Sequence, residues 1–425
     1  MKIQQKIFDV VVIGGGPAGM MAAGRAAELG AKVVLVDRNE KLGKKLLLTG
    51  KGRCNITHAE FNNKEFLKAF GSNGKFLFSG FKIFGPQQVV DFFESRGVKT
   101  KIEQGKRIFP KYGTASNVLN CLINYLREGK VVIKNNSRIF DIKLDGNVIK
   151  EIVTDKKERI TANNFIIATG GKSFPQTGST GNGFELAKKL GHNIITLMPA
   201  LVPIKTKENW PKKLQGLSLK NVGIKIIQNN TTIIEKVGEL LFTHFGVSGP
   251  MVMNVSQKIG ELLNDSSVEL LLDLKPGLSL NELDSRLQKD FAKYSNKNFK
   301  NALDDLLPQK IIETIIRISG VSSDKKICQI TKIQRQNLVN TIKGLKMTVS
   351  SLLGFEHAVV TNGGVDLKEI DSRTMRSKII SNLYFAGEVI DIDGPSGGYN
   401  LQNCWTTGYL AGQNAANVNP RSTLC

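Results

Sequence analysis

Three glycines near the start of the chain have the spacing of a pyrophosphate-binding turn. They are Gly14, Gly16 and Gly19, with Pro17 and Ala18 between the last two. In such a turn the first glycine permits the tight bend, the second lets the backbone approach the phosphates, and the third lets the following helix pack on the strand. The helix N-terminus would add free N–H groups and a partial positive charge. We therefore expect a dinucleotide at this turn.

The flanking segments provide the strand, helix and second strand that the motif requires. An apolar run over residues 7–13 precedes the glycines, a helix of small residues follows them, and a second apolar run ends at Asp37. Asp37 is placed to accept hydrogen bonds from a ribose diol. A further apolar strand ends in Ala168, Thr169 and Gly170, which we expect to line the cofactor.

A second glycine-rich segment near the C-terminus indicates which dinucleotide binds. The strand 382–389 ends at Gly387 and Glu388, and a loop containing Asp391, Asp393 and several glycines leads into a helix from Tyr399 to about residue 416. A simple nicotinamide enzyme does not need this element. An FAD protein does, because the helix N-terminus can face the flavin edge where negative charge accumulates on reduction. The alternative is a glycine turn that caps an ordinary core helix.

Length and composition fit a protein of several domains with ordinary cores. The chain has 425 residues, of which 41% are hydrophobic and 23% charged. No apolar run approaches the roughly 20 residues that span a bilayer, and Asp9 interrupts the N-terminal apolar stretch, so we expect a cytoplasmic protein. Five scattered cysteines form no CxxC pair, which argues against a metal centre or a dithiol relay. The chain contains one complete GxGxxG motif, so any NAD(P)H must visit the flavin transiently.

The formal net charge of +22 leaves two interpretations open. The sequence is rich in Ile, Asn and Lys, as an AT-biased coding sequence would make it, and we prefer this explanation. The alternative is an anionic partner such as a nucleic acid or an acidic membrane. The lysines are spread along the chain, without a dense basic block or a platform of basic and aromatic residues.

The pattern predicts an α/β protein whose nucleotide domain is built from both ends of the chain. We expect residues 1–195 and 350–425 to form it. Residues 196–349 would be inserted as a second domain, β-rich over 196–275 and helical over 280–345. Helices are expected over residues 86–96, 114–127, 183–190 and 303–318.

Six long motifs resemble one bacterial family. They are GGGPAGMMAA, KLLLTGKGRCNIT, IIATGGKSFPQTGSTGNG, LLFTHFGVSGP, TNGGVDLKEID and LYFAGEVIDIDGPSGGYNLQ. The chain is similar over essentially its whole length to the BaiN/YhiN-type flavoproteins. These are also labelled aminoacetone-oxidase-family FAD-binding enzymes, and they are distantly related to the succinate dehydrogenase/fumarate reductase flavoproteins. The resemblance implies non-covalent FAD, a Rossmann-like domain of the two-dinucleotide-binding-domain type, and an inserted β-barrel with a helical part.

The resemblance also implies positions for the cofactor-binding residues. The glycine turn would hold the pyrophosphate and Asp37 the adenosine ribose, while Ile139 would place its backbone at the adenine. The family often has Glu where this chain has Asp37, which is one methylene shorter and can still bind a diol. The remaining expected contacts are Arg38, Lys45, Lys51, Arg53, Cys54, Asn55, Ala168, Thr169, Gly170, Gly387, Glu388, Gly398, Tyr399, Asn400 and Leu401.

The catalytic acid or base is not marked by any motif. His244 lies in a glycine-rich loop, although a lone histidine is more often structural. Cys54 lies between Arg53 and Asn55 in a basic loop, which could lower its pKa, although we prefer a buried, unreactive thiol beside the cofactor. Tyr399 could donate a proton near the flavin or could serve packing.

We expect hydride transfer between flavin and a small substrate in an interdomain cleft. The leading version is an NAD(P)H-dependent reductase of an activated double bond. The alternatives are an amine oxidase that uses oxygen and, in another class, an RNA-associated flavoprotein.

Overall fold

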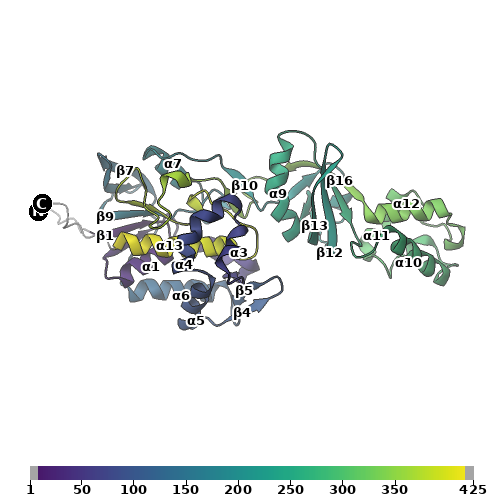
Figure 1. Cartoon of the computed structure of the whole chain (residues 1–425), viewed down its shortest axis with the longest axis horizontal. Helices are drawn as coiled ribbons and strands as arrows, with labels where there is room; N and C mark the ends of the chain where they lie inside the picture. The colour runs from purple at the N-terminus through teal and green to yellow at the C-terminus, as the bar shows by residue number, and fades with distance from the viewer. Residues whose placement is uncertain (1–7, 417–425) are drawn as a thin grey trace, which may run out of the picture. The chain divides into compact units, whose positions relative to one another are not determined.

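A computed structural model of the chain describes residues 8–416 (Figure 1). The chain divides into two compact units. One contains the chain up to Pro199 and from Phe355 onward, and the other contains Ala200–Gly354. Each unit has its own hydrophobic core.

The first unit is built on a seven-stranded sheet in the order β6-β2-β1-β9-β8-β7. The seventh strand, β18, pairs with the last residues of β9 on the side opposite β1. The strands β6, β2, β1, β9 and β18 run parallel, while β7 and β8 extend the sheet as an antiparallel hairpin. The sheet strands are β1 Phe8–Ile13, β2 Val33–Val36, β6 Val132–Lys134, β7 Ile139–Asp145, β8 Val148–Thr154, β9 Arg159–Ile167 and β18 Leu383–Phe385.

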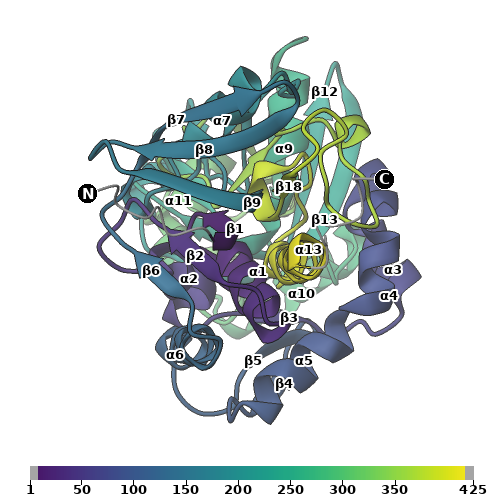
Figure 2. The same ribbon diagram turned by 90° about the vertical axis from the view of Figure 1, so that its left-hand side faces the viewer.

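The central strands are buried because helices cover the sheet. β2 is the run Val-Val-Leu-Val, and all four residues are buried, as expected for parallel strands covered on both faces. The helices α1 and α13 lie side by side along the sheet (Figure 2). Small residues permit this approach, since a Cβ on Gly408 would overlap the carbonyl oxygen of Ala18, and one on Gly412 that of Ala22. The helices of this unit are α1 Pro17–Glu28, α2 Lys44–Leu48, α3 Asn63–Lys68, α4 Phe78–Ile83, α5 Pro86–Ser95, α6 Ala115–Glu128, α7 Asn182–Lys189 and α13 Tyr399–Ala416.

A small antiparallel sheet in the first unit has the order β3-β5-β4. Its strands are β3 Thr57–His58, β4 Thr100–Glu103 and β5 Arg107–Pro110. The short strands β10 Met198–Ala200 and β17 Val360–Asn362 pair with each other.

The second unit contains a closed barrel in the order β11-β14-β13-β12-β15-β16, together with helices. Its strands are β11 Ile204–Thr206, β12 Ser218–Gln228, β13 Thr231–Phe242, β14 Gly246–Ser248, β15 Glu269–Asp273 and β16 Leu345–Leu352. Its helices are α8 Trp210–Lys213, α9 Pro250–Leu263, α10 Leu280–Lys293, α11 Gln309–Ser319 and α12 Lys332–Lys343.

One local prediction was wrong in this unit, and one helix was not predicted. The expected helix over 303–318 begins only at Gln309, because Pro308 disfavours helical conformation in the residue before it and occupies the cap position. The β-rich segment contains the helix α9, which starts with Pro250 at its first position. Val252, Val255 and Ile259 are buried at helical spacing, and this spacing was the available signal.

Candidate functional site: a dinucleotide cradle

The glycine turn joins β1 to α1 and leaves space at its centre. Gly14 has φ +107°, and a Cβ there would overlap the carbonyl oxygen of Ala168, so this position requires glycine. A Cβ on Gly19 would overlap the carbonyl oxygen of Gly14, which explains the close packing of α1 on the turn. Around Gly16, in contrast, no atom lies within 4 Å of the Cβ position. The backbone is therefore open to a ligand at the residue expected to face the pyrophosphate.

The start of α1 offers donors toward this space. Gly16 is the cap residue and has no side chain that could bond the first N–H groups, and Pro17 occupies the first helical position. The N–H groups of Ala18 and Gly19 thus belong to the free donors of a helix N-terminus, which favours an anion.

Asp37 lies at the end of β2 beside the glycine turn. Its carboxylate accepts hydrogen bonds from the backbone N–H of Gly15 at 2.5 Å and of Asn39 at 2.6 Å. The carbonyl of Asp37 accepts from the N–H of Ser137 at 2.9 Å, which brings the start of β7 and Ile139 to the same region. Arg38 is exposed and donates to the Thr180 hydroxyl at 2.5 Å.

The end of β9 forms the other side of the turn. The N–H of Ala168 donates to the carbonyl of Ile13 at 2.8 Å, and Gly170 follows with φ +72°. Thr169 has a buried hydroxyl without a hydrogen-bond partner, and Gly183 of α7 packs directly against it. A buried unpaired hydroxyl costs free energy unless a ligand or water satisfies it.

The C-terminal segment reaches the same place. β18 pairs with β9, and Gly387 follows with φ +78°, so close to the start of α1 that a Cβ would lie 2.7 Å from the Cβ of Ala18. At the start of α13, the Asn400 side chain bonds the N–H of Gly394 at 2.8 Å and its carbonyl at 2.7 Å, which closes the preceding loop. Gly398 packs against the backbone of Thr57, and Leu401 packs against the core that contains α1.

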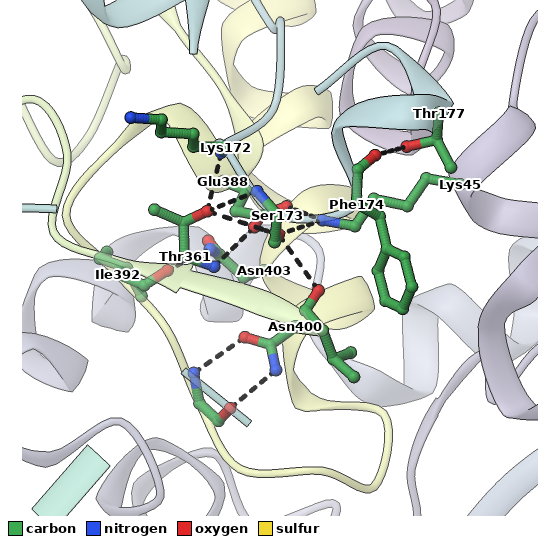
Figure 3. Close-up of polar contacts among 12 residues, drawn as sticks. Lys45, Lys172, Ser173, Phe174, Thr177, Thr361, Glu388, Ile392, Asn400 and Asn403 are labelled. Carbon is green, nitrogen blue, oxygen red and sulfur yellow. Dashed lines mark hydrogen bonds and ion pairs between the residues drawn. The ribbon is translucent and has the colours of Figure 1, made fainter. Parts of the chain in front are cut away.

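Glu388 and Lys45 form a partly buried ion pair at the centre of a polar network (Figure 3). Lys45 Nζ lies 2.7 Å from Glu388 Oε2 and donates to Ser173 Oγ at 2.7 Å. Glu388 Oε1 accepts from Ser173 Oγ and from the Thr361 N–H, each at 2.8 Å. Burial acts to raise the pKa of Glu388, but the Lys45 ammonium and these hydrogen bonds more than offset it, so the pKa lies below its ordinary value.

Ser173 and Thr361 were missing from the expected site. Ser173 follows the Ala-Thr-Gly-Gly strand end, and Thr361 opens the TNGG motif, so both lie inside motifs that marked the resemblance. Their hydroxyls also bond the backbone here, since Thr361 Oγ1 accepts from the N–H of Lys172 at 2.8 Å and of Ser173 at 3.1 Å.

The segment Lys51–Asn55 differs in part from expectation. Lys51 is exposed, and Arg53 lies 4.2 Å from the centre of the Phe109 ring and pairs with Glu103. The Cys54 thiol is fully buried, and burial raises its pKa to about 12, which agrees with the preferred interpretation of a buried, unreactive thiol rather than with a lowering by Arg53. A thiol with this pKa is not a nucleophile at neutral pH. Asn55 is buried, and its side-chain oxygen has no hydrogen-bond partner.

The two other catalytic candidates lie in different surroundings. His244 is exposed in the turn between β13 and β14 of the second unit, with its ring edge against Phe245. Tyr399 opens α13, and its ring stacks on His58 with centroids 4.6 Å apart and contacts Phe66. Burial raises the pKa of Tyr399. These contacts favour a packing role for Tyr399.

The residues present fit an extended dinucleotide. The open position at Gly16, the free N–H groups of α1 and the unpaired polar atoms of Thr169 and Asn55 lie on segments that meet around the glycine turn and the start of α13. Donors and acceptors left unpaired in the protein are those a bound nucleotide could satisfy.

Comparison with known proteins identifies the family of the chain. Residues 8–414 match the model of the HI0933-like protein Rossmann domain. The chain belongs to the HI0933-like family. The family consists of FAD-dependent Rossmann-fold proteins, so the predicted resemblance and the predicted FAD-binding α/β fold are confirmed.

Two relatives and one solved structure illustrate the similarity. The 3-dehydro-bile acid delta(4,6)-reductase of Clostridium scindens is 31% identical, with 95% of this chain and 98% of the relative aligned. The ribosomal RNA dihydrouridine synthase of Haemophilus influenzae is 32% identical, with 94% and 96% aligned. The open conformation of a flavocytochrome c3 fumarate reductase has a TM-score of 0.52 at 18% identity, covering 97% of this chain and 78% of that chain, which shows a shared fold.

Membership in the HI0933-like family supports an FAD-dependent oxidoreductase. Over residues 8–416, no helix is both long and apolar enough to cross a membrane.

Proposed function

We propose that the protein is an NAD(P)H-dependent flavin reductase that saturates a carbon–carbon double bond conjugated to a carbonyl. The similarity to the two relatives over nearly the whole chain carries this proposal. A delta(4,6)-reductase removes carbon–carbon double bonds, and dihydrouridine differs from uridine by two hydrogens across one such bond. The chemistry common to both names is hydride addition to an electron-poor alkene.

We further propose how this chain holds FAD, which supplies the hydride chemistry when bound. The turn from Gly14 to Gly19 and the N-terminus of α1 would bind the pyrophosphate, and Asp37 would bind the adenosine ribose. Gly387 and Glu388 would bind near the ribityl-phosphate. The start of α13, from Gly398 to Leu401, would direct its N–H groups to the flavin edge. The remaining predicted contacts would line the cofactor, except Arg53, whose side chain lies over Phe109 and pairs with Glu103.

Two substrate classes follow from the relatives, and we take a uracil ring in RNA as the first. The relative that acts on ribosomal RNA favours it, and a chain with a net charge of +22 would attract the phosphate backbone whatever the origin of that charge. A small enone is the second class, and the relative that acts on a bile acid favours it. A small molecule in an interdomain cleft was the original prediction, and the position of the substrate stays a prediction.

The test is the flavin absorption of the purified protein before and after anaerobic addition of NADPH or NADH. Rapid bleaching, followed by recovery of colour when a conjugated alkene or uridine-containing RNA is added, is the expected result. Flavin that stays yellow with both nicotinamides would overturn the reductase proposal. Amine-dependent bleaching with peroxide formation in air would instead establish the amine-oxidase alternative.

A further inference from the structure

One face of the β4–β5 hairpin carries a concentration of positive charge. Lys101 lies opposite Phe109 and Glu103 opposite Arg107, while the N–H of Lys111 donates to the carbonyl of Lys99 at 2.7 Å. Because residues two apart on a strand share a face, the side chains of these residues lie on one side of the hairpin. We call Lys99, Lys101, Arg107 and Lys111 the hairpin face, together with Arg53, which pairs with Glu103 of the same hairpin.

The charge of the hairpin face is poorly balanced. Glu103 pairs with both Arg53 and Lys101 at 2.9 Å. Hydrogen bonds from Thr100 lower the pKa of the Glu94 carboxylate, and Lys99 lies near enough to contribute to that lowering. Lys99 and Lys111 are exposed and form no ion pair with any residue of 8–416. Five cations thus face two carboxylates, Glu103 and Glu94, and the excess of positive charge creates a local field that attracts anions.

An exposed aromatic ring adjoins this charge. Tyr112 follows Lys111 directly, its residue is 73% exposed, and Lys111 Nζ lies 5.4 Å from its ring centre. The guanidinium carbon of Arg53 lies 4.2 Å from the centre of the Phe109 ring. Aromatic rings and arginine planes beside cations are the elements on which proteins stack unpaired bases while holding the backbone.

The hairpin is connected to the proposed flavin site through its own sheet. β3 pairs with β5, and the residues of β3 contact the start of α13 (Figure 2). Gly398 packs on Thr57, and the His58 ring stacks on Tyr399. A polymer held on the hairpin face therefore lies on the sheet that contacts the helix expected to meet the flavin.

We propose that the hairpin face binds unpaired RNA, with its lysines and arginines on the phosphates and Tyr112 stacked on a base. This inference rests on the RNA version of the proposed function. It commits to single-stranded RNA because the exposed ring needs an unstacked base, whereas a duplex offers mainly its backbone.

The experiment measures fluorescence anisotropy of a short labelled oligouridine with the full-length FAD-loaded protein across a salt series. The triple variant Lys99→Gln, Lys101→Gln, Lys111→Gln should weaken binding at least about tenfold and lower the slope of log affinity against log salt by about 2. Tyr112→Ser should weaken binding by about tenfold through lost stacking.

Matched controls come from exposed residues elsewhere in the same unit. The triple variant Lys156→Gln, Lys188→Gln, Lys189→Gln removes the same charge from exposed lysines without ion pairs, and Phe140→Ser removes a ring that is 70% exposed. Both controls should bind oligouridine as the unchanged protein does.

Each outcome decides the inference. Equal loss in the hairpin and control variants would overturn it, because only overall charge would matter. Equal affinity for oligouridine and its duplex with oligoadenosine, insensitive to Tyr112→Ser, would overturn the commitment to unpaired RNA. Binding to phosphatidylserine vesicles but not to oligouridine would assign the face to a membrane. Bleaching by NADPH tests the proposed reductase chemistry separately, because it requires no RNA.

Discussion

Lys45 Nζ lies 2.7 Å from Glu388 Oε2, although 343 residues separate them in the chain. Their side chains are only 21% and 15% exposed, respectively. The pair therefore connects α2, which contains Lys45, to the segment that follows β18, which contains Glu388. Segments from both halves of the chain meet here, and a partly buried charge pair is part of the connection.

Removal of one partner of this pair should be costly. We expect Lys45→Met to lower the free energy of unfolding by about 3 kcal/mol at pH 7, because the Glu388 carboxylate would stay largely shielded from water and charged without its partner. Urea unfolding at a fixed FAD concentration measures this. The pKa of Glu388 is lowered in the folded protein, so its stabilisation is present above the ordinary glutamate pKa and is lost as pH falls through the folded value.

The control for this prediction is the exposed pair Lys150–Asp145, whose side chains are 59% and 72% exposed. Lys150→Met should change the free energy of unfolding by less than about 1 kcal/mol. The double variant Lys45→Met, Glu388→Gln should recover part of the loss. An unchanged stability in Lys45→Met would show that the pair contributes nothing.

Gly16→Val should abolish FAD retention while the protein stays folded. Gly16 has φ −80°, which valine adopts readily, and a Cβ would enter open space, so only a ligand would clash with it. The ratio of flavin to protein absorbance after gel filtration measures retention, and circular dichroism reports folding. Gly277→Val is the matched control, since nothing lies within 4 Å of its Cβ position either. Full retention of FAD in Gly16→Val would show that the pyrophosphate does not bind at this turn.

Tyr399 should act through packing. Its ring contacts His58, Phe66 and Phe70, so Tyr399→Ala should cost about 3 kcal/mol of stability. Tyr399→Phe keeps the ring and should leave the stability and the rate of flavin reoxidation by substrate nearly unchanged. A rate reduced about 100-fold or more in Tyr399→Phe, without loss of stability, would instead identify the hydroxyl as a proton donor.

Asp391 should make stability depend on pH in the acidic range. Burial raises the pKa of its carboxyl to about 6, with a smaller contribution from Asp393. A raised folded pKa means that the stability contributed by the protonated carboxyl is fully present below the unfolded value, near 4, and is lost as pH rises through 6. Asp391→Asn should therefore be more stable than the unchanged protein at pH 8, by about 1 kcal/mol after allowance for partial solvent screening.

The measurement for Asp391 is the difference in unfolding free energy between the two proteins from pH 4 to pH 8. The advantage of Asp391→Asn should disappear as pH falls from 6 toward 4. The exposed Asp145→Asn serves as the comparison. A difference that stays constant over the range would refute the raised pKa.

The sequence by itself determined the elements that short-range chemistry specifies. The glycine spacing, the apolar runs of β1 and β2 and the acid at Asp37 require a strand–turn–helix–strand unit, because no other local structure satisfies all three. The C-terminal repetition of strand, glycines and helix then favoured FAD over a simple nicotinamide site. Local signals failed at Leu303 and in α9, where one proline delays a helix and another starts one.

The tertiary structure decided which distant residues meet. Ser173 and Thr361 join Glu388 only because β9, β17 and the segment after β18 come together, and no local pattern encodes that meeting. The hairpin face is partly local, because Lys99, Lys101, Arg107, Lys111 and Tyr112 all lie within residues 99–112. The pairing of β4 with β5 brings these residues together, and Arg53 joins them from a distant segment. Burial also decided the chemistry of Cys54, since desolvation outweighs a neighbouring cation whose side chain is directed to Phe109.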